Sequence, residues 1–158
     1  MPIEGDGCVV GLHVNPKGGV PKFPVDELFV TTTGCEGDRQ NDRKHHGGPH
    51  RAVCLMAYEL MEELAHEGHP ISPGSTGENL LIKGIQAESL LPGTVLKVGA
   101  AVLEITEHAK PCRKIAASFT NGAFQRLSHK KRAGHTRWYA KVVSEGRMSI
   151  GDQVSSNQ

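Results

Sequence analysis

Glycine and proline interrupt this chain so often that long helices have little room. The sequence holds 19 glycines and nine prolines in 158 residues. Both residue types favour turns and end regular elements. Between them stand short apolar runs rich in β-branched residues, which are typical of strands. The chain is therefore predicted to form many short strands joined by turns.

The expected strands and helices follow from these runs. We predict strands at residues 8–14, 27–33, 52–56, 79–82, 94–98 and 101–106, a hairpin of 138–144 with 147–150, and a frayed tail from Ser155. Leu60, Met61 and Leu64 recur at helical spacing and predict a helix over 58–67 that buries them in the core. Residues 112–119 and 123–129 are predicted short helices.

This order of elements favours one mainly β domain over residues 1–158, with a core at about 8–154. Strands alternate with helices too rarely for a doubly wound parallel sheet. We therefore expect a mixed, largely antiparallel β-barrel with a few helices. No internal repeat or linker divides the chain.

Composition excludes several classes of protein. The formal net charge is only +1, so no overall field favours nucleic acid. No apolar run approaches the roughly 20 residues that a membrane span needs. The start of the chain has no secretory signal, and the four cysteines follow neither a disulfide framework nor a zinc motif. We expect a reduced, cytoplasmic protein. Dinucleotide, Walker A and nucleophile-elbow motifs are missing as well.

A polar segment at residues 37–50 is the first candidate for a binding site. Adjacent glycines let backbone N–H groups approach a ligand, and Arg39, Arg43, Lys44 and Arg51 add positive charge. This pattern suits phosphate or another oxyanion, although an ordinary basic loop has the same composition. A zinc site of His45, His46, His50 and Cys54 is not favoured, because the spacing matches no common zinc motif.

Two shorter segments are further candidates. Gly77-Glu78-Asn79 places a carboxylate beside an amide, which can recognise a polar heterocycle, but a simple turn can hold the same residues. Residues 132–137, followed by Trp138-Tyr139, alternate cations with aromatic side chains. They can line a cleft or form the outer face of a strand.

Cys112 carries the strongest chemical signal. It lies in Lys110-Pro111-Cys112-Arg113-Lys114, where three positive charges favour the thiolate form of the sulfur. The same cations suit a negatively charged partner. A half-buried structural cysteine at a strand end remains the alternative.

Taken in order, these segments resemble the MOSC domain, the module named after the C-terminal part of molybdenum cofactor sulfurases. The resemblance runs over roughly residues 9–154 and is closest to small stand-alone bacterial members. It rests on Gly37-Asp38-Arg39, His46-Gly47-Gly48-Pro49 with Arg51-Ala52-Val53, Gly77-Glu78-Asn79, Lys110-Pro111-Cys112, and Trp138 to Val142 with Gly146 and Gly151-Asp152. Position 50 is His where relatives often carry an acidic residue, and Gly134-His135-Thr136 departs from the commoner Arg-Gly arrangement.

The resemblance implies a β-barrel that binds the molybdenum cofactor (molybdopterin), which purified protein can lack. Cys112 would be the catalytic residue and the ligand of molybdenum, since thiolate is a soft ligand. The residues that would hold the pterin and its phosphate are Arg39, His46, Gly47, Gly48, Arg51, Glu78, Asn79, Lys110, Arg113 and Lys114.

Two functions follow from the resemblance, and a third stays open. The first is a molybdenum-dependent oxidoreductase that reduces N-hydroxylated compounds and takes electrons from an external donor protein. The second is a sulfur carrier or cofactor-binding module, in which a cysteine desulfurase supplies a persulfide to Cys112. In the third, Cys112 is structural and the barrel binds another anionic metabolite. We favour the enzyme with a small-molecule substrate, because no sulfur-producing domain is present in this sequence.

Overall fold

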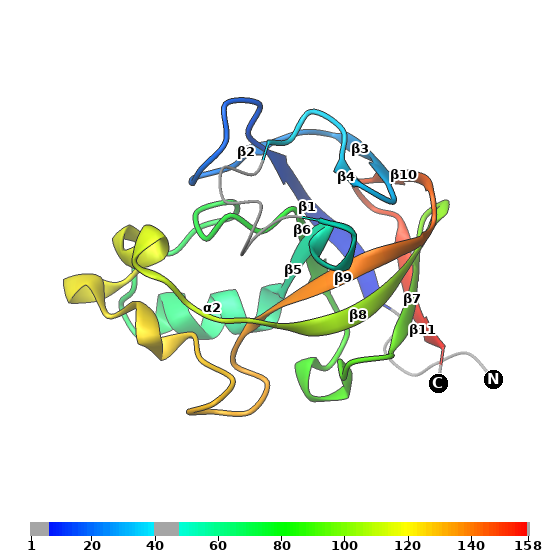
Figure 1. The fold of residues 1–158 in the computed structure, drawn as a ribbon. Coiled ribbons are helices and arrows are strands. Elements are labelled where there is room, and N and C mark those ends of the chain that lie inside the picture. Colours follow the sequence, from blue (N-terminus) through cyan, green and yellow to red (C-terminus); the bar gives the residue numbers. More distant parts are fainter. Residues whose placement is uncertain (1–6, 40–47, 158) are drawn as a thin grey trace.

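The structure, a computed structural model, describes residues 7–39 and 48–157. Within these residues, one sheet runs in the order β11-β7-β8-β9-β5-β6-β1-β2, and a further pairing of β11 with β1 closes it into a barrel (Figure 1). The barrel strands are β1 (Gly7–Val14), β5 (Val53–Ala57), β6 (Leu80–Lys83), β7 (Val95–Val98), β8 (Ala101–Ala109), β9 (Arg137–Ser144) and β11 (Gln153–Asn157). Only β5 and β6 pair in parallel among them. The expected mixed, largely antiparallel β-barrel is confirmed.

A small second sheet lies against one end of the barrel. It has the order β10-β3-β4, made of β3 (Glu27–Thr31), β4 (Gly34–Cys35) and β10 (Gly146–Ser149). The two-residue β2 (Phe23–Pro24) pairs with the end of β1.

The predicted hairpin of 138–144 with 147–150 is wrong. β9 pairs with β5 and β8, whereas β10 pairs with β3. The chain leaves the barrel at Gly146, where a Cβ atom would lie 2.5 Å from the carbonyl oxygen of Ala100. Close backbone contact with the β7–β8 turn therefore redirects the strand into the second sheet.

The predicted frayed tail is also wrong. β11 pairs with β7 over Val154–Asn157 and with β1 at Val154 and Gln153. Val154 is fully buried. Val154 is the single apolar residue of this strand, so the sequence gives little apolar signal, but backbone pairing on both sides makes the strand the closure of the barrel.

Helices cover one side of the barrel (Figure 1). The predicted long helix is confirmed as α2 (Tyr58–His66), which buries Leu60, Met61 and Leu64. The predicted helices at 112–119 and 123–129 form 3₁₀ turns instead, interrupted by Asn121 with φ +57°. The 3₁₀ elements are η1 (Pro49–Arg51), η2 (Ala87–Ser89), η3 (Arg113–Ser118), η4 (Thr120–Gly122) and η5 (Phe124–Arg126).

Two apolar clusters account for most of the core. One is drawn from the barrel strands and includes Leu55, Leu103 and Trp138. The other joins the α2 side chains to Ile115, Phe119 and other residues of the helical side. The segment after Cys112 is thus fixed to the barrel through α2. In the part of the chain described, no helix combines the length and apolarity that crossing a membrane requires.

Candidate cofactor site around Cys112

Cys112 lies where β8 has ended and η3 begins. Its backbone carbonyl accepts a hydrogen bond from Ile115 N–H at 3.1 Å, which starts the 3₁₀ turn. The side chain is half-buried, whereas Lys110, Arg113 and Lys114 are exposed. The thiol thus lies near the surface among exposed cationic side chains that an anionic ligand can reach.

Arg137, the first residue of β9, anchors this segment through hydrogen bonds to two backbone carbonyl groups. One Nη donates to the carbonyl oxygen of Thr76 at 2.9 Å, and the other donates to that of Lys110 at 3.3 Å. The guanidinium therefore joins the turn before β6 to the residue two positions before Cys112. Only 4% of Arg137 is exposed.

The hydrogen bonds of Arg137 are incomplete. Its Nε atom is buried without a hydrogen-bond partner, and no carboxylate of the described residues forms an ion pair with it. A buried charge without a counter-ion is costly to the folded state. The site therefore has a built-in preference for a negative group close to this guanidinium.

Tyr139 and Cys54 lie beside Arg137 on the same face of the barrel. Burial raises the pKa of the Tyr139 hydroxyl, and the Cys54 and Cys112 thiols raise it further, while Arg137 and Arg51 oppose them. Burial likewise raises the pKa of the Cys54 thiol against the field of Arg137. Cys54 is thereby kept neutral.

Arg51 covers the same aromatic ring. Its guanidinium carbon lies 5.3 Å from the centre of the Tyr139 ring, and its Nε and Nη2 donate to the Glu107 carboxylate at 3.2 and 3.0 Å. Cation–π contact and a bidentate ion pair hold the side chain in place. Among the predicted site residues, Arg51 and Cys112 are thus brought to one face.

Glu78 is fully buried and bonded within the protein. Its carboxylate accepts hydrogen bonds from the Gly74 backbone N–H and the Thr76 hydroxyl, both at 2.6 Å. The Thr76 residue that binds Glu78 also accepts from Arg137 through its carbonyl. Glu78 therefore stabilises the turn whose Thr76 carbonyl accepts a hydrogen bond from Arg137.

Asn79 is fully buried as well, and its side chain links three parts of the chain. Its Oδ1 accepts from the Cys54 backbone N–H at 3.0 Å, and its Nδ2 donates to His13 O at 3.2 Å and to Asp38 Oδ2 at 2.9 Å. Asp38 also pairs with the buried Lys22. These bonds fix the turn before β6 to the segment that leads toward residue 40.

An open cavity of about 720 Å³ is lined by residues between 31 and 39, Asp38 and Arg39 included, and by Gly48 and Pro49. Arg39 is exposed, and its backbone N–H donates to Asn15 O at 3.0 Å. Gly48, with φ +88°, lines the same cavity. Arg43, Lys44, His45, His46 and Gly47 lie outside the described residues. Residues 7–39 and 48–157 contain no group of three metal-binding side chains.

The sequence placed Arg137 and Tyr139 in a segment that can line a cleft, but it did not link either residue to Cys112. The available signal was an arginine at the start of an apolar strand, two positions from a tyrosine. Such a spacing puts both side chains on one face of a strand. An arginine on a face that is otherwise buried needs partners.

Comparison with known proteins identifies the family. The model of the MOSC domain matches residues 42–155, so this chain belongs to the MOSC domain family. The protein YflK of Bacillus subtilis strain 168 is 35% identical over 137 residues, which is 84% of this chain and 60% of YflK. Protein YiiM of Escherichia coli strain K12 is 29% identical over 146 residues, covering 87% of this chain and 64% of YiiM.

Solved structures agree with the fold. A crystal structure of a hypothetical protein is 27% identical, has a TM-score of 0.74, and is matched over 95% of this chain and 67% of its own. YiiM from Geobacillus stearothermophilus is 20% identical with a TM-score of 0.72, over 96% of this chain and 75% of its own. The chain spans less than two thirds of the length of YflK and YiiM of the strains above.

Proposed function

We propose that this protein binds the molybdenum cofactor through Cys112 and reduces N-hydroxylated small molecules. The single observation that carries the proposal is that the segment of the half-buried Cys112 thiol is bound, at the Lys110 carbonyl, by the buried and incompletely bonded guanidinium of Arg137. A soft sulfur ligand and a preformed positive charge suit a cofactor that offers a metal and a phosphate. Membership in the MOSC domain family supports the same function.

Different residues would bind different parts of such a cofactor. Cys112 would ligate the metal, and Arg137 would face an anionic group of the bound molecule. Lys110, Arg113 and Lys114 are exposed and free to close over the phosphate, and Arg39, Arg51 and Gly48 would contact the pterin side. His46 and Gly47 remain part of the proposed set. Glu78 and Asn79 act by positioning the turn, because their side chains are bonded within the protein.

When bound, the cofactor supplies a metal centre that exchanges oxygen and electrons with an N–OH group. The reduction of a hydroxylamine to an amine and water consumes two electrons and two protons. An external electron-donor protein is part of the proposal, and a cytoplasmic location stays a prediction.

Turnover of a hydroxylamine tests the enzyme directly. Protein loaded with cofactor and supplied with a competent donor should reduce a hydroxylamine, and the Cys112→Ala variant should not. Cys8→Ala is the matched control, because Cys8 is also half-buried but lies in β1. Equal turnover by wild type and Cys112→Ala would disprove the role of Cys112.

A sulfur carrier is the second candidate, and the half-buried position of Cys112 beside two exposed cations favours it as well. In this function a cysteine desulfurase would transfer sulfur to Cys112 as a persulfide. Mass spectrometry after incubation with a desulfurase and cysteine should show one added sulfur on Cys112. An unmodified mass argues against the carrier and leaves the reductase as the proposal.

A further inference from the structure

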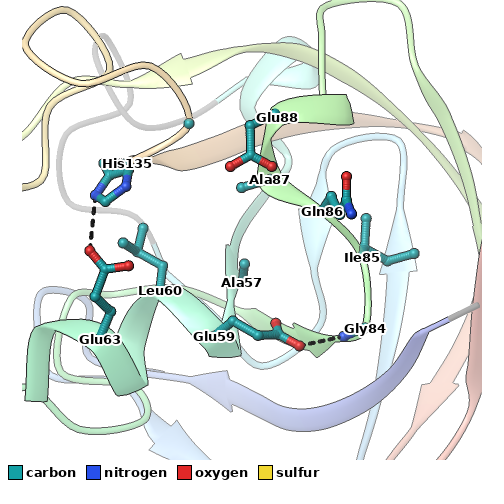
Figure 2. Close-up of a pocket in the computed structure, with 11 residues that line it drawn as sticks. Ala57, Glu59, Leu60, Glu63, Gly84, Ile85, Gln86, Ala87, Glu88 and His135 are labelled. Carbon is teal, nitrogen blue, oxygen red and sulfur yellow. Dashed lines mark hydrogen bonds and ion pairs between the residues drawn. The ribbon is translucent and has the colours of Figure 1, made fainter. Parts of the chain in front are cut away.

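A second cavity, of about 310 Å³, lies beside the first two turns of α2 (Figure 2). Three segments line it: the start of α2, the turn after β6 at residues 84–88, and Gly134-His135. None of its lining residues belongs to the site around Cys112. Its volume falls within the range of small-molecule sites, which is about 300–1,000 Å³.

The inner surface of this cavity is apolar. Ala57, Leu60 and Ile85 are buried in the core and line the cavity together with Ala87. Apolar walls with a few polar groups around them are the usual make-up of a site for a small organic molecule. A hydrated inorganic ion gains little from such walls.

The rim carries two exposed carboxylates, Glu59 and Glu88, and neither forms an ion pair within the described residues. Glu59 accepts a hydrogen bond from the Gly84 backbone N–H at 2.8 Å, which is a neutral donor. Glu88 has no side-chain hydrogen bond or ion pair within residues 7–39 and 48–157. Figure 2 shows the two side chains on opposite sides of the same open space.

Glu63, the third carboxylate of the rim, is in a different state. Its Oε2 lies 3.2 Å from Arg126 Nη2, 3.8 Å from Arg132 Nη1 and 3.8 Å from His135 Nδ1. The negative charge of Glu63 is therefore already paired with the positive charges of Arg126 and Arg132. The uncompensated charge of the cavity belongs to Glu59 and Glu88.

Gly134 lies next to the Glu88 side chain at the edge of the cavity. A Cβ atom at Gly134 would lie 3.5 Å from Glu88 Cγ, and the φ of +83° is one that side chains other than glycine's rarely adopt. The Gly134-His135 pair, which the proposed function does not use, thus shapes this second cavity.

We infer that this cavity binds a small organic cation with a flat apolar body, such as an amidinium or guanidinium compound. The cationic head lies between Glu59 and Glu88, since carboxylates pair well with planar N–H donors. The body packs on Leu60 and Ile85. A metal ion is disfavoured, because no three metal-binding side chains converge in the described part of the chain.

Calorimetry with benzamidine and benzamide tests the charge requirement. The two probes share a shape, but only benzamidine is a cation. Benzamidine should bind the wild type, and benzamide should bind much more weakly. Glu88→Gln and Glu59→Gln should each weaken benzamidine binding about two- to fivefold, as expected for an exposed ion pair. Glu62→Gln, an exposed carboxylate of α2 outside the cavity, is the control and should leave the affinity unchanged.

Amide NMR spectra locate the bound probe. Benzamidine should shift the Gly84 and Gly134 resonances, and it should do so equally in Cys112→Ala, so this inference stands apart from the proposed function. No binding at millimolar benzamidine, equal binding of benzamide, or equal affinities of Glu88→Gln and Glu62→Gln would overturn it. Resonance shifts confined to the Cys112 segment would overturn it too.

Discussion

At the scale of single residues, buried polar side chains hold the segments of the candidate site together through hydrogen bonds. Arg137, Glu78 and Asn79 are each almost fully buried, and each bonds to backbone atoms of a neighbouring segment. Arg137 joins the turn before β6 to the Cys112 segment, Glu78 stabilises that turn, and Asn79 joins it to β1 and β5. Buried polar networks of this kind are sensitive to the loss of one member.

Replacing Asn79 should therefore be costly. Asn79→Ala leaves the Cys54 N–H without its acceptor in the interior, and it removes the donor to His13 O and one of two donors to Asp38 Oδ2. We expect the free energy of unfolding to fall by about 2–4 kcal/mol. Urea unfolding measures the change, with the exposed Gln86→Ala as control. A loss no larger than that of the control would contradict the bridging role.

His13 should make the protein sensitive to acid. Burial lowers the pKa of His13 from its ordinary 6.5, although the Glu78 carboxylate acts in the opposite direction. The unfolded chain therefore takes up a proton at a higher pH than the folded one. The contribution of neutral His13 to the free energy of unfolding is fully present above pH 6.5, and it is lost as the pH falls from 6.5 through the lowered pKa of the folded protein.

The sensitivity can be measured with His13→Gln, which cannot titrate. Its unfolding free energy should fall less steeply below pH 6.5 than that of the wild type. His66→Gln, an exposed position on α2, should keep the wild-type profile. Parallel profiles of wild type and His13→Gln would rule out the buried neutral imidazole as a cause.

At the scale of elements, local sequence predicted the strands better than their partners. The strand predicted at 138–144 is confirmed as β9, and the predicted Gly99-Ala100 turn does join β7 to β8. The partner of β10 was wrong because a single close approach at Gly146, invisible in the sequence, sends it to β3. The helical signals at 112–129 gave 3₁₀ turns, since packing against α2 rather than propensity holds that segment.

Adding one methyl group at Gly146 should disturb this crossing. Gly146→Ala places a Cβ atom within 2.6 Å of two backbone atoms of Ala100, which cannot move as a flexible side chain can. We expect a loss of about 1–3 kcal/mol from overpacking. Thermal unfolding compares it with Ser144→Ala, an exposed neighbour. Equal melting temperatures would show that the turn yields without strain.

Arg126 should tie the 3₁₀ segment to α2 in a manner that depends on pH. Its guanidinium binds the Glu67 carboxylate at 2.9 and 2.6 Å, and this hydrogen bonding lowers the pKa of Glu67 from 4.5. The stabilisation from this ion pair is present above pH 4.5, and it disappears as the pH falls through the lowered pKa of Glu67. Exposed pairs are screened by salt, so the effect is local rather than global.

Amide hydrogen exchange over residues 122–127 reports this attachment. Arg126→Gln should speed exchange there near neutral pH and leave the barrel strands unchanged. Arg147→Gln, which removes an exposed pair with Glu27, is the control. Unchanged exchange in Arg126→Gln would show that apolar packing alone holds the segment.

At the scale of the whole molecule, the fold could be read from the sequence more fully than the site. Frequent glycine and proline with short β-branched runs indicated the barrel, whereas the closing strand β11 gave almost no apolar signal. In the site, charge around Cys112 is local in sequence and was visible. Arg137 lies 25 positions later and reaches the segment only through the pairing of β8 with β9. Such juxtapositions need the tertiary structure.

Elemental analysis for molybdenum tests the central claim most directly. Wild type, Cys112→Ala and the control Cys8→Ala would be purified from a host that makes the cofactor. We predict close to one molybdenum atom per chain in wild type and Cys8→Ala, and loss of the metal in Cys112→Ala. Equal metal in all three proteins, or none in any of them, would contradict the role of Cys112 as the anchor of the cofactor.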